Sequence, residues 1–274
     1  MPWIRVAVPI PVDDTFVYEL PAGEKPEPGL RVLVPFGRRK LLGTVVAEEL
    51  AAPSRAIKRI AGIPEPRLTI TPELFDLCRW VSEYYLAPLG EVLHAAAPST
   101  AALRRRAAPS ADGAEDEPHG WQASPPPTRA QLNADQKAAL GELEAALRQE
   151  IFRPFLLHGV TGSGKTAVHL HAAHTAVLAG GQALMLVPEI ALSPQTLDSF
   201  RQGGFDRVAL YHSTLRPRER ADVWNGVARG DIDLVVGTRS AIFLPFRDLR
   251  FLAVDEEQDG AYKQEDSPRY HARD

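Results

Sequence analysis

The sequence contains very little cysteine and no long apolar run. Among its 274 residues there is one cysteine, Cys78, which excludes a disulfide framework and any zinc site built from several cysteines. No window reaches the ~20 apolar residues that a membrane-spanning helix requires. The N-terminus also lacks the basic flank and apolar stretch of a signal peptide. These absences predict a cytoplasmic protein without membrane contact.

The sequence also lacks a strong excess of charge of either sign. The formal net charge is −4 at pH 7, with 31 Lys and Arg against 35 Asp and Glu. A protein can bind nucleic acid through a local basic surface while the whole chain stays acidic, so this balance argues neither for nor against DNA. Apolar residues are plentiful at 45%, which is enough for packed cores in about two domains.

The first third of the chain changes from a strand pattern to a helix pattern. Residues 1–60 hold short alternating apolar and β-branched runs separated by prolines and a turn-like PFGRRK segment, which predicts a small barrel or sandwich. Residues 71–95 are predicted to be helical, because Thr71 can cap a helix that has Pro72 at its first position. The apolar residues of this helical stretch that share one face are Leu74, Leu77, Cys78 and Val81.

The rest of the chain divides into a polar segment and an α/β region. Residues 98–130 are rich in Pro, Ala, Ser and charge, which predicts a flexible or extended linker. A helix is predicted from about Asn133, and its apolar residues at helical spacing are Leu140, Leu143, Leu147 and Ile151. From Phe155 onward apolar strands alternate with helices, as in a parallel α/β sheet. The predicted strands are residues 155–160, 183–189, 207–212, 232–238 and 251–257.

A phosphate-binding loop follows the first of these strands. GVTGSGKT, residues 159–166, matches G-x-x-x-x-G-K-[ST] in full, between a predicted strand and a predicted helix. Glycines let backbone N–H groups close around phosphates at the positive end of the helix dipole. Lys165 should reach the β- and γ-phosphates, and the Thr166 hydroxyl should coordinate Mg²⁺. The residues predicted to hold the nucleotide are Gly162, Ser163, Gly164, Lys165 and Thr166.

Two adjacent carboxylates end the last predicted strand. Asp255 and Glu256 lie in FLAVDEEQ, ninety residues after Lys165. Asp255 is placed to hold Mg²⁺, and Glu256 to orient and activate the attacking water. An adjacent pair favours hydrolysis over transfer to a small molecule. Without the phosphate loop, the same acidic residues could form a solvated turn.

LNADQKAAL leaves two interpretations open for Gln136. Asn133 and Gln136 are three residues apart, which is typical of a capping box at a helix N-terminus. Alternatively, Gln136 hydrogen-bonds the edge of an adenine. The residues themselves do not decide between the two.

Two further loops, at residues 187–195 and 235–246, each follow a predicted strand. Loops at the carboxyl ends of parallel strands are where α/β sheets bind ligands. Thr238, Arg239 and Ser240 offer hydroxyls and a guanidinium that suit a DNA phosphate backbone. Taken alone, Arg239 could equally be a surface residue.

The motifs occur together in a specific order. Along the chain they are LN..Q, GVTGSGKT, LVPEIALSPQ, HSTLRPRER..VW, VVGTRSAIFLPF, VDEEQDGAYKQ and RYHARD. This set closely resembles the PriA family of bacterial replication-restart DNA helicases, in superfamily 2. The segments VAVPIPVDDTFVYELP and GLRVLVPFGRRKLLGTVV are similar to the small domain with which that family holds the 3′ end of a nascent strand at a fork.

The resemblance implies an α/β fold with two parts. A RecA-like parallel-sheet P-loop lobe is expected at residues 131–274, preceded at residues 1–97 by a small β-rich DNA-end-binding domain with a helical extension. The linker at residues 98–130 is too short and too polar for the winged-helix domain that the family has there. The family's zinc-binding cysteines and second RecA-like lobe have no counterpart before Asp274, so no zinc ligands are expected in this chain.

The resemblance also implies roles for individual residues. Gln136 stands where superfamily 2 enzymes carry the glutamine that binds adenine. Lys165, Asp255 and Glu256 are the expected catalytic residues, with ATP and Mg²⁺ as cofactors. The DNA contacts implied by the family are Phe16, Gly37 and Lys58 in the N-terminal domain and Tyr262 and Lys263 in the lobe.

The implied function is replication restart. Such a protein recognises stalled or branched forks and couples ATP hydrolysis to DNA unwinding and replisome reloading. Its expected partners are forked DNA with a nascent 3′ end, single-stranded DNA, primosome proteins and single-strand-binding protein. The alternative is a fork-binding platform that does not hydrolyse ATP. Four departures favour it. Gln258 stands where the family usually has His, and Val17 where its 3′-end pocket usually has an acidic residue, and the winged-helix domain and the second lobe have no counterpart here.

Overall fold

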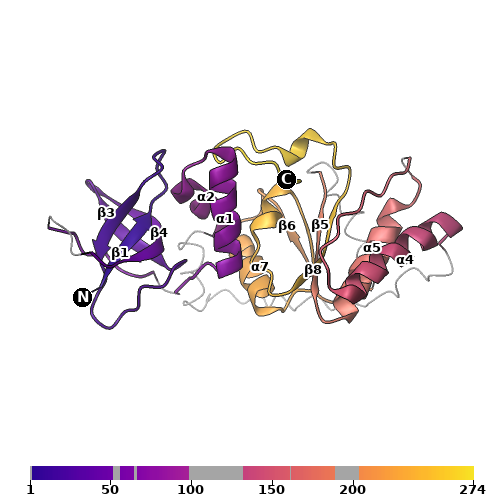
Figure 1. Ribbon diagram of the computed structural model, residues 1–274, viewed down its shortest axis with the longest axis horizontal. Helices are drawn as coiled ribbons and strands as arrows, with labels where there is room; N and C mark the ends of the chain where they lie inside the picture. The colour runs from indigo at the N-terminus through magenta and orange to yellow at the C-terminus, as the bar shows by residue number, and fades with distance from the viewer. Residues whose placement is uncertain (1, 52–55, 65–66, 99–131, 161, 189–203) are drawn as a thin grey trace, which may run out of the picture.

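The computed structural model describes residues 2–51, 56–64, 67–98, 132–160, 162–188 and 204–274. The predicted linker and most of the loop at residues 187–195 lie outside the described residues. Figure 1 shows an elongated arrangement, with a β-rich unit at one end, two helices beside it, and a sheet flanked by helices beyond them.

The N-terminal β-rich unit is a small barrel. Its strands are β1 (Trp3–Ala7), β2 (Thr15–Glu19), β3 (Arg31–Phe36) and β4 (Arg39–Glu49). They pair antiparallel in the order β2-β1-β4-β3, so β2 and β3 are the edges of the sheet. Glu19 of β2 exchanges backbone hydrogen bonds with residues 58–60, and Leu33 of β3 exchanges them with residues 61–62. This segment covers both edges, so that of the two predicted architectures, a small barrel or a sandwich, the described residues form the barrel.

Two helices form the predicted helical stretch: α1 (Pro72–Tyr85) and α2 (Leu89–Ala96). Thr71 caps α1 as predicted, because its side chain accepts a hydrogen bond from the N–H of Leu74. The break between the helices has a local cause. Leu86 is left-handed with a φ of 52°, and Pro88 cannot continue a helix that would need its N–H.

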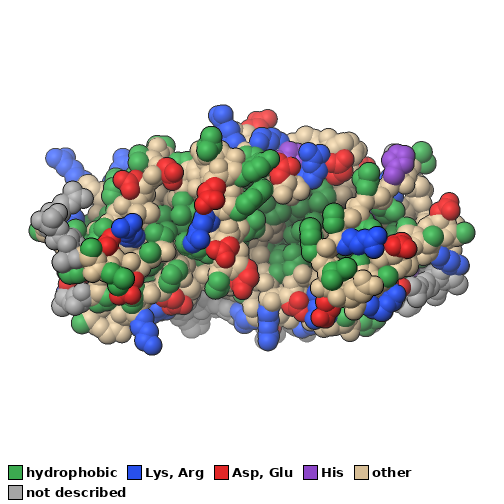
Figure 2. All heavy atoms as spheres, viewed as in Figure 1, with side chains coloured by type: hydrophobic (Ala, Val, Ile, Leu, Met, Phe, Trp, Pro, Cys, Tyr) green, Lys and Arg blue, Asp and Glu red, His purple; other side chains and the backbone are tan. Residues whose placement is uncertain are grey.

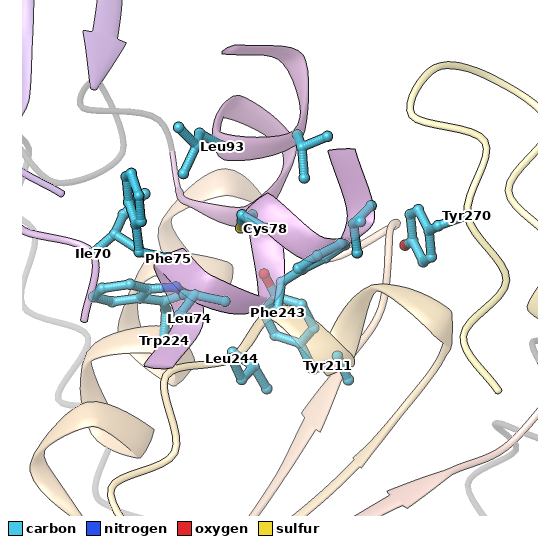
Figure 3. Packing of buried hydrophobic residues seen from close by; sticks show 14 of the residues in the cluster. Ile70, Leu74, Phe75, Cys78, Leu93, Tyr211, Trp224, Phe243, Leu244 and Tyr270 are labelled. Carbon is cyan, nitrogen blue, oxygen red and sulfur yellow. The ribbon is translucent and has the colours of Figure 1, made fainter. Parts of the chain in front are cut away.

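The two helices share one hydrophobic core with the α/β region. Figure 3 shows Cys78 of α1 and Leu93 of α2 in the same cluster as Trp224, Phe243 and Tyr270, which come much later in the chain. The predicted apolar face of α1 is therefore buried against the lobe. The helical extension therefore packs against the lobe as well as following the barrel in the chain.

The second helix, α2, also contacts the barrel closely. Gly90 is required at this contact, because a Cβ there would lie 1.9 Å from the Val8 carbonyl oxygen. The buried guanidinium of Arg31, at the start of β3, donates to the Leu93 carbonyl oxygen of α2 at 3.0 Å and to the Thr44 hydroxyl at 3.1 Å. Burial lowers the pKa of Arg31 to about 10. The helices thus contact the barrel on one side and the lobe on the other.

The lobe contains a parallel sheet flanked by helices. Its elements are α4 (Ala134–Gln149), α5 (Lys165–Leu178), β5 (Gln182–Leu186), β6 (Val208–Tyr211), α7 (Pro217–Arg229), β7 (Leu234–Gly237) and β8 (Leu249–Val254). The strands pair in parallel in the order β6-β7-β5-β8, which confirms four of the five predicted strands. In α4, Leu140 is buried and Leu143 and Leu147 pack on the core, whereas Ile151 lies beyond the helix and is exposed.

The fifth predicted strand, residues 155–160, is not formed. The strand β8 is an edge of the described sheet, and residues 155–160 pair with no strand of it. The side chains of Leu156 and Val160 are 81% and 78% exposed, and Leu157 alone of the segment packs against the core. An apolar run becomes a strand only when its backbone hydrogen-bonds to a neighbouring strand, and residues 155–160 make no such pairing with the free side of β8. The prediction of a strand is therefore wrong for this segment.

Candidate nucleotide site and DNA surface

The described residues of the predicted phosphate loop, 159–160 and 162–166, lead into α5, and no strand is formed in the described residues directly before them. Gly162 and Gly164 have φ values of +78° and +82°, in the left-handed region that favours glycine. Gly164 directly precedes α5, so the loop N–H groups lie at a helix N-terminus where the dipole favours anions. The loop is also tight, since a Cβ on Gly159 would lie 2.7 Å from the Ser163 Oγ atom. This geometry fits a backbone cradle for phosphates.

Lys165 lies within its own loop. Its Nζ donates to the carbonyl oxygens of Gly159 and Val160, at 2.7 and 3.2 Å. Phosphate oxygens could replace these two acceptors without moving the lysine away from the loop. Thr166 follows as the second residue of α5, partly exposed beside the same loop.

Gln136 takes part in both the helix cap and the phosphate loop. The Asn133 side chain accepts from the Gln136 N–H, and the Gln136 Oε1 accepts from the Asn133 N–H, both at 2.9 Å. The capping-box interpretation is therefore confirmed. The Gln136 Nε2 also donates to the Ser163 carbonyl oxygen at 2.8 Å, which brings this amide to the loop. Adenine binding by Gln136 stays a prediction.

The predicted carboxylate pair follows β8 directly. Asp255 is anchored at the end of the sheet, because its N–H donates to the Leu186 carbonyl oxygen of β5 at 2.9 Å. Its Oδ1 accepts from the Glu256 N–H at 3.1 Å. Glu256 is exposed and has a φ of +47°, a left-handed conformation that costs energy for any residue with a Cβ. Strained residues cluster at active sites, which fits the role predicted for Glu256.

A histidine not singled out from the sequence lies close to both parts of the site. His169 is one turn after Lys165 on α5. Burial lowers the pKa of His169, while the charge of Asp255 opposes that shift and the charge of Lys165 adds to it. Since both charges act on one imidazole, α5 and β8 bring Lys165 and Asp255 into one region. The buried Nδ1 of His169 has no hydrogen-bond partner in the described part of the chain. The run HLHAAH was the only signal for this residue.

The residues present fit a nucleotide bound with Mg²⁺. The loop and Lys165 offer donors to phosphates, and Thr166 and Asp255 offer oxygen ligands to the metal. The described residues contain no group of three or more His, Cys, Asp or Glu side chains that could hold a metal ion by themselves. Mg²⁺ usually takes one or two protein oxygens and completes its shell with phosphate oxygens and water. The donor set suits that kind of site.

Thr238 and Arg239, predicted to contact DNA, make contacts inside the protein. Thr238 is only 4% exposed, and its N–H donates to the Tyr211 carbonyl oxygen. The Arg239 guanidinium donates to Gln264 Oε1 at 2.8 Å and to the Ala261 carbonyl oxygen at 2.9 Å. As placed, Arg239 supports the loop that follows β8, and Thr238 is bonded to the end of β6. A direct contact with DNA would require their side chains to move.

Tyr262 and Lys263, also predicted to contact DNA, differ in exposure. Tyr262 is fully buried, and its hydroxyl lies 3.1 Å from the Leu186 carbonyl oxygen and 2.5 Å from that of Asp255. Burial raises the pKa of Tyr262, so this hydroxyl stays a donor. Lys263 is exposed. Of the four lobe residues predicted to contact DNA, Lys263 therefore has the most accessible side chain in this structure.

The predicted residues of the DNA-end pocket lie on one part of the barrel. The Phe16 ring of β2 packs edge-on against Phe36, with 5.1 Å between the ring centres, and Phe36 directly precedes Gly37 in the turn to β4. Gly37 is exposed with a φ of +59°. The Lys58 carbonyl oxygen accepts from the N–H of Glu19, so Lys58 runs along the edge of the same strand. The structure thus places Phe16 against Phe36, the residue before Gly37, and Lys58 along the edge of β2.

No extended basic patch appears on the face drawn in Figure 2. Lys and Arg side chains alternate there with Asp and Glu. A DNA contact on this face would rest on a few cations rather than on a broad field. No helix among the described residues is long and apolar enough to cross a membrane.

Comparisons with known proteins match both parts of the chain. The family model described as DEAD/DEAH box helicase matches residues 133–272, and the model described as 3′DNA-binding domain matches residues 5–98. Replication restart protein PriA of Treponema pallidum is 34% identical over 280 residues, covering 99% of this chain and 41% of that protein. PriA of Haemophilus influenzae is 31% identical over 340 residues, covering 99% of this chain and 46% of its own length.

A further relative is similar over part of the chain only. PriA of Bacillus subtilis is 43% identical over 143 residues, which cover 52% of this chain and 18% of that protein. The chain thus spans less than half the length of these curated relatives. Over that span it combines the 3′ DNA-binding domain with the helicase domain, in that order. The chain belongs to the DEAD/DEAH box helicase family and, within it, to the PriA proteins.

Proposed function

We propose that this chain provides the DNA-end-binding and nucleotide-binding parts of a replication-restart motor that acts on forked DNA. The observation that carries the proposal is the phosphate loop at the start of α5, close to the Asp255–Glu256 pair at the end of β8. A barrel with an exposed turn at Gly37 is joined to the lobe that carries this site by α1 and α2, which share a core with the lobe and contact the barrel. The relatives' name, replication restart protein, agrees with such an arrangement.

Each residue of the site has a separate task in ATP hydrolysis. The loop N–H groups and Lys165 bind and orient the phosphates, with Gln136 holding the loop through Ser163. Thr166 and Asp255 would hold Mg²⁺, which when bound neutralises charge on the phosphates. Glu256 orients the attacking water and accepts its proton.

The first test is nucleotide binding by the Lys165→Ala variant. Removing a charged donor to phosphate should weaken binding of a fluorescent ATP analogue by roughly 10- to 100-fold, the factor expected for a hydrogen bond to a charged group. Lys137→Ala on α4 is the matched control, since it removes an equally charged side chain outside the loop. Equal affinity of the wild type and Lys165→Ala would contradict the proposal.

A non-hydrolysing fork-binding platform is the second candidate, favoured by the exposed Gln258 after the carboxylate pair. The rate of ATP hydrolysis by the protein, measured with and without a forked DNA carrying a free 3′ end, distinguishes the motor from the platform. Stimulated turnover that Glu256→Gln lowers by roughly 10²- to 10⁴-fold, with binding intact, supports the motor. Tight fork binding without any turnover supports the platform.

A further inference from the structure

Three cations lie next to one another in the hairpin tip, here defined as residues 37–40, between β3 and β4 of the barrel. In the register of the two strands Phe36 pairs with Arg39, so the turn is made of Gly37 and Arg38. Gly37 has a φ of +59°, as a two-residue loop of type II′ requires at its first position. The hairpin tip is therefore a short paired ribbon with a tight turn.

The hairpin tip is fixed to the rest of the barrel. On its other side β4 pairs with β1, and residues 61–62 hydrogen-bond to β3. The ring of Phe36, the last residue of β3, packs edge-on against Phe16. Arg39 and Lys40 are consecutive strand residues, so their side chains leave opposite faces of the ribbon. The fold thus presents positive charge on both faces of a firmly held tip.

The cations of the hairpin tip lack the carboxylate partners that the other exposed arginines of the described barrel have. The paired arginines are Arg5 with Glu49, Arg59 with Glu19, and Arg67 with Glu24 and Glu27. Arg38, Arg39 and Lys40 are exposed and form no ion pair within the described part of the chain, not even with Asp13 and Asp14 in the loop before β2. Their charge is therefore available to a ligand from outside.

Neighbouring unpaired cations suit an anionic surface of high charge density. Double-stranded DNA carries a negative charge about every 1.7 Å along its axis, and cations that neutralise its phosphates release bound counterions. Sites for single-stranded DNA combine cations with aromatic side chains on which bases stack. The hairpin tip contains no aromatic residue, and the adjacent Phe36 ring is already packed against Phe16. The tip therefore fits the backbone of a duplex better than an unstacked single strand.

We propose that the hairpin tip binds the phosphate backbone of double-stranded DNA next to a 3′ end. The inference rests on the DNA-end-binding half of the proposed function and adds a second, separate contact to it. Gly37 is predicted to lie at the pocket for the terminal nucleotide, and Arg38 follows it directly, so the duplex that carries this nucleotide passes the tip. Contacts with phosphates carry no sequence information, so the tip holds any duplex end. In Figure 1 the barrel lies at the opposite end of the molecule from α4 and α5, so this contact is far from the nucleotide site.

The experiment measures how the affinity for a duplex depends on salt. Each contact with a duplex phosphate contributes about 0.9 to the slope of log K against log salt concentration. The combined variant Arg38→Gln, Arg39→Gln and Lys40→Gln should therefore lower this slope by about 2 to 3, and weaken binding at least about ten-fold near 0.1 M salt. Binding of a fluorescein-labelled duplex is followed by anisotropy from about 50 to 200 mM NaCl, without nucleotide. A slope equal to that of the wild type overturns the inference.

Two further variants separate a local contact from a loss of net charge or of the fold. The combined variant Arg5→Gln, Arg67→Gln and Arg229→Gln removes the same charge from arginines that pair with carboxylates, and it should keep the wild-type slope. An equal loss in this variant would reduce the effect to net charge and overturn the inference. Arg38→Lys with Arg39→Lys keeps the charge of the tip and should also keep the slope, because a phosphate contact needs a cation. A loss as large as that of the glutamine variant would contradict a phosphate contact.

Two further DNA probes separate the hairpin tip from the end pocket and from single strands. A duplex whose 3′ ends carry phosphate blocks the end pocket, and the glutamine variant should lose as much affinity for it as for the duplex with free 3′ ends. A loss that vanishes on the blocked duplex, or that is equally large on a labelled oligothymidylate, overturns the assignment to duplex phosphates. A wild type that binds none of these DNAs counts against the proposed function itself. A wild type that binds duplex ends with a slope that the glutamine variant shares counts against the hairpin tip alone.

Discussion

The barrel and the lobe treat the edges of their sheets differently. In the barrel, residues 58–62 hydrogen-bond to both edge strands and close the structure. In the lobe, β8 is an edge, and residues 155–160 beside the phosphate loop expose Leu156 and Val160. The barrel thus closes on itself, whereas the glycine-rich loop before α5 is attached to a segment that pairs with no strand of the described sheet. Residues 155–160 should therefore open at a lower free-energy cost than the paired strands of the barrel and of the lobe.

Hydrogen exchange should show the largest difference. Amides of residues 155–160 should exchange faster than those of β4 and β5 by roughly 10³-fold or more, because unpaired segments open at almost no cost while central strands open at a cost near the global stability. The measurement is exchange followed by mass spectrometry on the unliganded protein. The strand β5 serves as the control within the lobe, since every residue in it is buried.

Protection of residues 155–160 equal to that of β5 would remove the contrast. It would mean that this segment is paired in solution and that the lobe, like the barrel, leaves no apolar strand unpaired. Protection that appears only with nucleotide would sharpen the contrast, because it would tie the order of the segment to the contacts of Lys165 with Gly159 and Val160.

A pair of glycine substitutions should give the next largest effect. Gly90→Ala places a Cβ 1.9 Å from the Val8 carbonyl oxygen, and the resulting overpacking should lower the free energy of unfolding by about 1–3 kcal/mol. Gly141→Ala in α4 meets no atom within 4 Å, and it should raise stability by about 1 kcal/mol, because alanine is the better helix former. Urea unfolding measures both. An equal change in the free energy of unfolding for both variants would contradict the prediction that Gly90 lies at a tight contact and Gly141 does not.

The sequence predicted the parts of the fold that local patterns determine. The barrel strands, the Thr71 cap and four strands of the parallel sheet follow from alternation, capping chemistry and apolar runs, and all are present. The exception is residues 155–160, whose apolar run is as strong as the others. A strand also needs a partner at its edge, and that partner is a property of the whole fold rather than of the segment.

The same limit applies to individual site residues. The pattern around Lys165 predicted a phosphate loop, and the left-handed glycines agree with it. Thr238 and Tyr262 were predicted as DNA contacts from residue type and resemblance, but burial depends on what packs over them. His169 was missed because the run HLHAAH does not show which of its histidines lies near the carboxylate pair, and that depends on a long-range neighbour, Asp255.

The smallest expected effect is on the rate at which a thiol reagent labels Cys78. This rate tells whether α1 and α2 open together with the barrel or stay with the lobe. Cys78 is fully buried in the core that α1 shares with the lobe, and burial raises the pKa of its thiol to about 12. At pH 8 a disulfide reagent should therefore react with it only when this core opens. Gly90→Ala disturbs the contact of α2 with the barrel, on the other side of the helices.

If the helices stay with the lobe, Gly90→Ala should change the labelling rate of Cys78 by less than about two-fold, even though the protein has lost stability. If they separate together with the barrel, labelling should accelerate by roughly 5- to 150-fold, the factor that a loss of 1–3 kcal/mol represents. Labelling of the wild type in urea supplies the rate for open protein. An unchanged rate would place the boundary between the two regions at the Gly90–Val8 contact, so that the barrel could move while α1 and α2 stay with the lobe.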